Sequence, residues 1–261
     1  MSRILVLVLS FDAEPWLSIE LEGQRQTWAQ DPPPGVQVLF YYGLTRGPTY
    51  WLSKVTAKAL KVARLRRARS AFIRRMGRWS SGRPARRVGS RIHTGVPESY
   101  VNTNAKLRAA LRHALATDDF DYLLRTNTSS YVHLPGLQRF VADLSAQAAP
   151  FYGGFLGAKS GISYASGAGI LISRDVAEAV ATDPAWEYDL VDDVAVGSSV
   201  ERLGIRPTAI PRIDIPSPRD EISSDRLRDC YLVRCRGQSC RSHDVLIMRR
   251  VHAGYASLER G

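Results

Sequence analysis

Short apolar runs alternate with longer amphipathic stretches along most of the chain. The segment Arg3–Ser10 contains six consecutive apolar residues, several of them β-branched, and such a run is typical of a buried strand. Further strands are predicted at Val36–Tyr42, Tyr122–Leu124, Tyr131–Val132, Phe151–Phe155, Ala168–Ser173 and Arg206–Ile210. Helices are predicted over Trp16–Ala29, Tyr100–Ala116 and Asp192–Leu203, and from Pro135 and Arg174 onward.

This alternation of strands and helices predicts an α/β fold with a mainly parallel central sheet flanked by helices. The length of 261 residues fits a single domain spanning residues 1–261. Ligands of such sheets bind beyond the carboxyl ends of the strands. We therefore expect a site at Ser10–Pro15, at Thr126–Ser130 and at the turn before Asp192, whereas the tail Pro216–Gly261 shows no clear pattern.

The formal charge of +11 is concentrated in one part of the chain. Between Lys54 and Arg91 there are 14 Lys and Arg residues and no Asp or Glu, which leaves 22 basic against 25 acidic residues elsewhere. A nearly neutral domain with one basic segment is not typical of a nucleic-acid-binding protein. Trp51–Arg78 has helical composition, and Ser80–Gly95, rich in Gly, Ser, Pro and Arg, is expected to be a mobile loop.

Targeting and cysteine patterns favour a cytoplasmic protein. The apolar run near the N-terminus is too short for a signal-peptide core and is followed by no small-residue cleavage site. Cys230, Cys235 and Cys240 are then expected to be reduced, and their spacing of five does not match the usual zinc-binding pattern.

The chain contains no phosphate-binding P-loop, no dinucleotide fingerprint and no serine nucleophile elbow. Its clearest candidate for chemistry is the acidic pair Asp192-Asp193 at a predicted helix start. The helix dipole alone would favour two acids there. Alternatively, one carboxylate stabilises the helix while the other faces a cleft as a general base. Arg125 and Lys106 could each bind an anion, or be solvated surface charges.

Seven short segments in a fixed order indicate a protein family more specifically than any single motif does. They include an Arg-x-Thr-Trp helix, a Tyr-x-x-Gly-x-Gly strand and an acidic-Asp-x-x-x-Gly helix start. The segments are Arg25–Trp28, Glu98–Lys106, Tyr122–Thr126, Tyr131–Pro135, Tyr164–Gly169, Asp192–Gly197 and Arg202–Ile205. In this order the sequence resembles the β-1,3-glycosyltransferase family that includes the β-1,3-galactosyltransferases and Fringe.

The resemblance implies a GT-A-like fold and inverting transfer of a hexose or N-acetylhexosamine from a UDP-sugar. The acceptor would be a hydroxyl of a glycan or lipid-linked molecule. Asp193 would be the general base, and Asp192 a second candidate or a helix cap. Gly167, Ala168 and Gly169 would let the backbone approach a sugar closely. The expected donor-binding residues are Arg25, Lys106, Arg125, Asn127 and Ser129, together with Ser10 and Phe11, which are candidates only by their position at the end of the first strand.

The sequence departs from the family at the metal motif. Where the family has Asp residues that hold a divalent cation, usually manganese, this chain has Asn127-Thr128-Ser129. Neutral Asn and Ser oxygens are weaker ligands for Mn2+ or Mg2+. Three outcomes are open: a metal-independent enzyme in which Arg25, Lys106 or Arg125 supplies the positive charge, weak metal binding, or a non-catalytic module that binds nucleotide sugars or glycans.

The basic segment has no counterpart in the resemblance, so residues 51–95 are interpreted as an insertion. Apolar residues recur at intervals of three and four in its first part, with Lys and Arg between them. A basic amphipathic helix of this kind suits an anionic membrane surface, reached through residues 54–91, on the inner face of the membrane. A solvated charged helix is the alternative, and nucleic acid is a weaker third.

Overall fold

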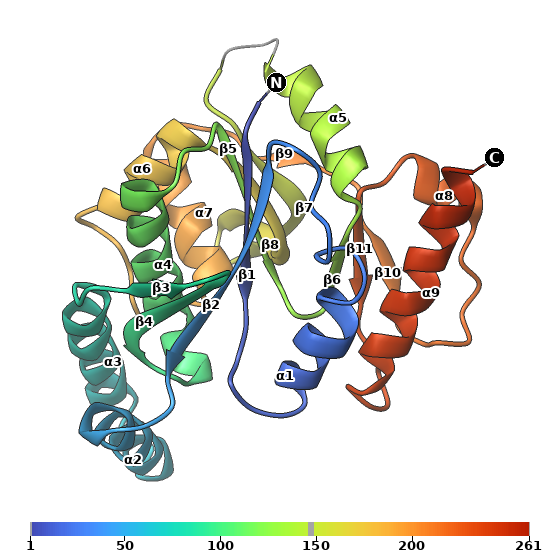
Figure 1. Ribbon diagram of the computed structural model, residues 1–261. Helices are drawn as coiled ribbons and strands as arrows, with labels where there is room; N and C mark the ends of the chain where they lie inside the picture. Colours follow the sequence, from blue (N-terminus) through green and yellow to red (C-terminus); the bar gives the residue numbers. More distant parts are fainter. Residues whose placement is uncertain (1, 146–148, 261) are drawn as a thin grey trace.

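The computed structural model describes residues 2–145 and 149–260, and its centre is a large mixed sheet (Figure 1). In spatial order its strands are β3 (Arg86–Val88), β4 (Arg91–Pro97), β2 (Val36–Leu44), β1 (Ile4–Leu9), β5 (Tyr122–Asn127), β8 (Ile162–Ser173), β7 (Tyr152–Lys159) and β9 (Thr208–Ala209). A second, three-stranded sheet contains β10 (Ile213–Ile215), β11 (Leu232–Cys235) and β6 (Ser130–Val132).

The predicted α/β fold is confirmed, and the parallel part of the sheet is the run β4-β2-β1-β5. The next strand, β8, is antiparallel to both β5 and β7 and forms a hairpin with β7, whose other neighbour, β9, is parallel to it. The hairpin turn is Ser160-Gly161, where both residues have positive φ, as tight hairpin turns require. This hairpin extends the strand predicted at Ala168–Ser173 back to Ile162.

Helices cover both faces of the large sheet. The helical elements of the described residues are α1 (Trp16–Ser18), a π-helical turn η1 (Ile19–Gln24), α2 (Pro48–Val62), α3 (Arg66–Ser81), a 3-10 turn η2 (Tyr100–Asn102), α4 (Thr103–Thr117), α5 (Leu134–Ser145), α6 (Arg174–Thr182), α7 (Asp192–Arg202), α8 (Ser224–Arg228) and α9 (His243–Leu258). In Figure 1, α4, α6 and α7 lie on one side of the sheet, and α5 and α9 on the other.

Two hydrophobic cores explain why the first apolar run has no polar alternation. Ile4, Val6 and Val8 belong to the core that includes α5 and α9, whereas their neighbours point to the core of α4, α6 and α7. Successive strand side chains point to opposite faces, so a strand covered on both faces must be apolar at every position. All six residues of β1 are buried.

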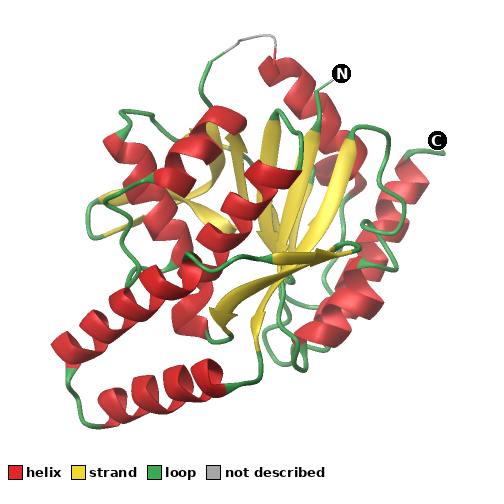
Figure 2. Ribbon diagram, turned by 60° about the vertical axis from the view of Figure 1, so that its left-hand side comes forward, coloured by secondary structure: helices red, strands yellow, loops and turns green. Residues whose placement is uncertain are grey.

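The basic segment differs from its prediction. It forms two helices, α2 and α3, joined through Arg64, whose φ of 57° breaks the helical path. We call residues 48–81 the arm, and Figure 2 shows it extending from the body as a helical hairpin. The expected mobile loop over Ser80–Gly95 is wrong: it holds the end of α3, all of β3 and the start of β4. Backbone pairing with β2 and within the β3–β4 pair outweighs the local composition there.

Two other expectations are revised. The helix predicted over Trp16–Ala29 is limited to α1 and η1, followed by turns. The tail Pro216–Gly261 contains α8, β11 and the four-turn helix α9, which the sequence pattern did not reveal. Within residues 2–145 and 149–260, none of the helices combines the length and apolar character needed to cross a bilayer.

Candidate functional site

A cavity of about 640 Å³ lies at the carboxyl ends of β1 and β5, where parallel sheets bind their ligands. Its size is typical of small-molecule sites. The walls come from the loop after β1, the segment after β5, the middle of β8, the start of α7 and the tail. The lining residues are Leu9, Phe11, Trp16, Glu98, Ser99, Tyr100, Thr103, Arg125, Asn127, Thr128, Ser129, Ser166, Gly167, Ala168, Val191, Asp192, Asp193, Arg234, Arg236 and Arg241.

The two carboxylates of the acidic pair lie in different environments. Asp192 is buried and forms an ion pair with Arg125. Asp193 is half-buried and accepts hydrogen bonds from the backbone N–H groups of Gly167 (3.1 Å) and Val194 (2.9 Å). Among the described residues, no Lys, Arg or His side chain lies within 4 Å of the Asp193 carboxylate.

Burial, and then the charge of Asp192, raise the pKa of Asp193 above its ordinary value. Burial alone disfavours the charged form of a carboxyl, and a like charge nearby adds to this effect. The charge of Arg125 opposes this rise only in part. A carboxylate in a cleft with a raised pKa and no ion pair of its own is well suited to accept a proton. This arrangement is the chemistry expected of a general base.

Arg125 is a structural centre of the site. Its guanidinium donates hydrogen bonds to Asp192, to the carbonyl oxygen of Gly167 and to the hydroxyl of Tyr41 (3.2 Å). A side chain at Gly167 would collide with this guanidinium and displace it from its hydrogen bonds. Burial opposes the charge of Arg125, but Asp192, Tyr41 and Asp193 together outweigh it and raise the pKa of Arg125.

Three expected donor-site residues lie behind or beside the cavity. Lys106 is fully buried, paired with Glu98, and lies 4.0 Å from the centre of the Phe11 ring. Burial lowers its pKa, and the charge of Glu98 opposes that shift. The hydroxyl of Ser10 donates to Glu20, which also pairs with Arg25 at 2.8 Å. None of Ser10, Arg25 and Lys106 lines the cavity.

The structure brings the other expected residues together. Phe11, Arg125, Asn127, Ser129, Gly167, Ala168, Asp192 and Asp193 all line the cavity. Gly169 does not, because the space that its missing side chain leaves is filled by Leu232. Contact of Gly167 and Ala168 with a sugar remains a prediction.

Asn127 and Ser129, which the sequence offers only as weak or absent metal ligands, are held in the protein's own hydrogen bonds. The Asn127 side-chain oxygen accepts from the Ser129 N–H (2.9 Å), and its amide nitrogen donates to Gly167 (3.1 Å). The Ser129 hydroxyl accepts from Arg241 at 2.9 Å. Among the described residues, no three His, Cys, Asp or Glu side chains form a cluster suited to a metal ion. The oxygens of Asn127 and Ser129 therefore do not fit a divalent cation, which prefers charged oxygen ligands.

Sequence reasoning missed the three arginines that the tail contributes to the cavity, Arg234, Arg236 and Arg241. They lie on and after β11, a strand of four residues with no clear pattern. The one available signal was their clustering within eight residues that contain no acid. Trp16, Glu98, Tyr100 and Thr103 also line the cavity and were not expected there.

Comparison with known proteins gives weak structural similarity only. No protein-family model matches the sequence, and no curated protein matches it significantly. The chain is similar to a mannosyltransferase from Pyrobaculum calidifontis solved with GDP-Man and Mn2+, with 14% identity and a TM-score of 0.49. That alignment covers 100% of this chain and 65% of the other, so this chain spans less than two thirds of its length.

A second similar structure is a glycosyltransferase involved in glycosylating the major capsid of PBCV-1. Its identity is 12% and its TM-score 0.43, and the alignment covers 95% of this chain and 99% of the other. Both TM-scores are below 0.5, so neither likeness establishes an activity for this chain.

Proposed function

We propose that this protein is a glycosyltransferase that transfers a hexose or N-acetylhexosamine from a UDP-sugar to a hydroxyl of a glycan or lipid-linked acceptor. The observation that carries the proposal is that residues from separate segments of the sequence meet in one cavity. Arg125, Gly167 and Asp193 are far apart in the sequence and come from three of the segments that resemble β-1,3-glycosyltransferases. All three line one cavity. If the resemblances of these segments were coincidental, their residues would not be expected to lie together at the ligand-binding end of the sheet.

In the proposed reaction, Asp193 acts as the general base. An acceptor hydroxyl oxygen attacks the anomeric carbon, and its proton passes to the Asp193 carboxylate. The bond between that carbon and the diphosphate oxygen breaks, and the diphosphate leaves with the electron pair. The configuration at the anomeric carbon is inverted because attack and departure occur on opposite faces. The backbone bonds to Asp193 orient its carboxylate for this transfer.

A donor panel tests the proposal directly. The protein is incubated with UDP-sugars, and with GDP-sugars for comparison, in the presence of mixed glycan and lipid-linked acceptors. Released nucleoside diphosphate is measured. We expect release above the uncatalysed rate with at least one UDP-sugar, and thermal stabilisation of the protein by UDP. Absence of both would contradict the proposal, while stabilisation without release or transfer would indicate a non-catalytic binding module.

A further inference from the structure

The tail arginines lie directly beside the segment that replaces the family's metal motif. In the small sheet, Arg234 is paired with Ser130. The backbone N–H of Cys235 donates to the carbonyl of Ser129 at 2.7 Å, and Arg241 donates to the Ser129 hydroxyl at 2.9 Å. The fold therefore brings Arg234 of β11 and Arg241 of the following loop to the position where the Asp-rich family is expected to hold a cation.

These arginines also differ from the cations expected from sequence. Arg25, Lys106 and Arg125 each have a carboxylate partner. In the described part of the chain, no carboxylate lies within 4 Å of the guanidinium groups of Arg234 and Arg236. The third tail arginine, Arg241, shares its charge with Asp244 at 2.8 Å.

Arg234 is partly buried, and its charge is compensated only in part by Asp214, which lies opposite it on the neighbouring strand β10. Its Nε is buried and has no hydrogen-bond partner. Burial lowers its pKa, and the charges of Arg212, Arg236 and Arg241 lower it further. Of these three, Arg212 is neutralised by Asp214 in a two-point pair at 2.7 and 2.9 Å. Uncompensated buried charge is costly, so an anion bound here would relieve the mutual repulsion.

A diphosphate has the negative charge and the acceptor oxygens that suit this arginine cluster. Guanidinium groups bind phosphate through two parallel hydrogen bonds, which gives both affinity and orientation. The three arginines line the main cavity and also a neighbouring groove of about 570 Å³, so a ligand can reach them from either side. Positive charge placed in advance also stabilises a leaving group whose negative charge grows during reaction.

We propose that Arg234 and Arg236, together with Arg241, bind the diphosphate of a nucleoside diphosphate in place of a divalent cation. This inference rests on the proposed function for the identity of the ligand. It is nevertheless tested by binding alone, so turnover is not needed to judge it.

The test measures UDP binding by calorimetry, with and without EDTA, using the full chain. Uridine and inorganic pyrophosphate serve as ligands that separate the base from the diphosphate. We expect EDTA to change the UDP affinity by less than about threefold. The variant Arg234→Gln with Arg236→Gln should weaken UDP and pyrophosphate binding on the order of 100-fold and leave uridine binding unchanged, because charge-assisted hydrogen bonds are lost.

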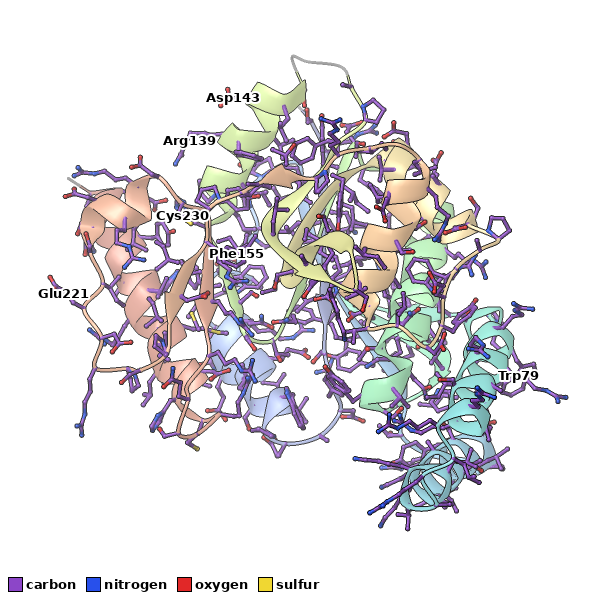
Figure 3. The ribbon with its side chains drawn as sticks, turned by 180° about the vertical axis from the view of Figure 1, so that it is seen from behind. Trp79, Arg139, Asp143, Phe155, Glu221 and Cys230 are labelled. Carbon is purple, nitrogen blue, oxygen red and sulfur yellow. The ribbon has the colours of Figure 1, made fainter. Side chains whose placement is uncertain are left out.

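The matched control is Arg139→Gln, an exposed arginine on α5 that Figure 3 labels, and it should bind UDP normally. Circular dichroism checks that each variant is folded, and Arg236→Gln alone, at an exposed position, provides a second test if the double variant is not. Loss of UDP binding in EDTA with recovery on adding Mn2+ would overturn the inference. So would unchanged binding in the folded variants. UDP binding without turnover would contradict the proposed function and leave the inference intact.

A separate observation concerns the arm, residues 48–81. Six of the fourteen large apolar side chains that are exposed among the described residues lie on it: Trp51, Leu52, Val55, Val62, Leu65 and Trp79. It also carries ten Lys and Arg residues and no Asp or Glu. Within α2 only Ser53 is buried. Trp79 lies at the outer margin of the molecule in Figure 3.

The arm is attached close to the cavity mouth. It begins just after β2, at the same edge of the sheet as the loops that follow β1 and β5. The Ser53 hydroxyl accepts a hydrogen bond from Asn102 at 3.1 Å, and the neighbouring Tyr100 and Thr103 line the cavity. A surface that binds the arm would therefore lie near the opening of the site.

We infer that the arm docks on an anionic lipid surface, its apolar side chains entering the interface while its Lys and Arg residues pair with lipid headgroups. Charge complementarity favours this occupant, because the arm has no acid to repel anionic headgroups. Exposed tryptophans are also typical of residues at a membrane interface.

Vesicle flotation tests the arm. The full chain is mixed with vesicles of neutral phosphatidylcholine, or of the same lipid with phosphatidylserine. We expect about tenfold or greater preference for the anionic vesicles, and a loss on the order of tenfold in the variant Trp51→Ser with Leu52→Ser and Val55→Ser. Leu246→Ser, an exposed leucine on α9, is the control. Equal binding to both kinds of vesicle, or undiminished vesicle binding by the triple variant, would overturn the inference. So would a dimer or an RNA complex that the triple variant no longer forms while it still binds vesicles.

Discussion

Replacing Asp193 by Asn is expected to lower kcat by about 10²–10⁴-fold, because the amide cannot accept the proton of the acceptor hydroxyl. Asn has nearly the same shape, and its oxygen can still accept one of the two backbone hydrogen bonds that hold Asp193. UDP affinity should stay within about threefold of the original, since Asp193 is not expected to contact the diphosphate. Released UDP gives kcat, and calorimetry gives the affinity.

The pH profile of the unmodified enzyme separates a base from a merely structural carboxylate. Since burial and Asp192 raise the pKa of Asp193, its basic form is lost at a higher pH than for an ordinary Asp. The rate should therefore fall as pH decreases through that raised pKa, and the Asp193→Asn variant should lack this limb in its residual activity. Asp143→Asn, an exposed acid on α5, is the control. A kcat for Asp193→Asn equal to that of the parent would remove Asp193 from the role of base.

Replacing Arg125 by Met is expected to lower the free energy of unfolding by about 3–5 kcal/mol, the usual cost of breaking a buried ion pair from one side. The carboxylate of Asp192 would be left buried without a partner, and Gly167 and Tyr41 would each lose a hydrogen bond. Urea denaturation followed by circular dichroism measures the change. Arg139→Met, at an exposed position, should change stability by less than about 0.5 kcal/mol.

A second substitution tests the cause of that loss. In the double variant Arg125→Met with Asp192→Leu, the pair is replaced by apolar side chains, which is often close to neutral. We expect most of the lost stability to return. If Arg125→Met instead kept full stability and bound UDP weakly, Arg125 would be an anion-binding residue, as the sequence alone allowed, and its structural role would be rejected.

The accuracy of the sequence predictions varies along the chain for physical reasons. The strand over Tyr122–Leu124 and the helix beginning at Asp192 were predicted well, because burial on both faces and an acidic first turn leave strong local signals. The loop predicted over Ser80–Gly95 was wrong, because β4 pairs with β2, about 50 residues earlier in the chain, and β3 pairs in turn with β4. Nothing local reports such a partner.

By itself, the sequence determined the α/β class of the fold, the acidic pair at the start of α7, the absence of the Asp-rich metal motif and the concentration of the net positive charge in one segment. Each of these depends on residue type and local order alone. Only the tertiary structure decided which cations are already neutralised and which face the cavity, because that depends on the distances between charges. It paired Arg125 with Asp192 and placed Arg234, from an unpatterned tail, opposite Ser130.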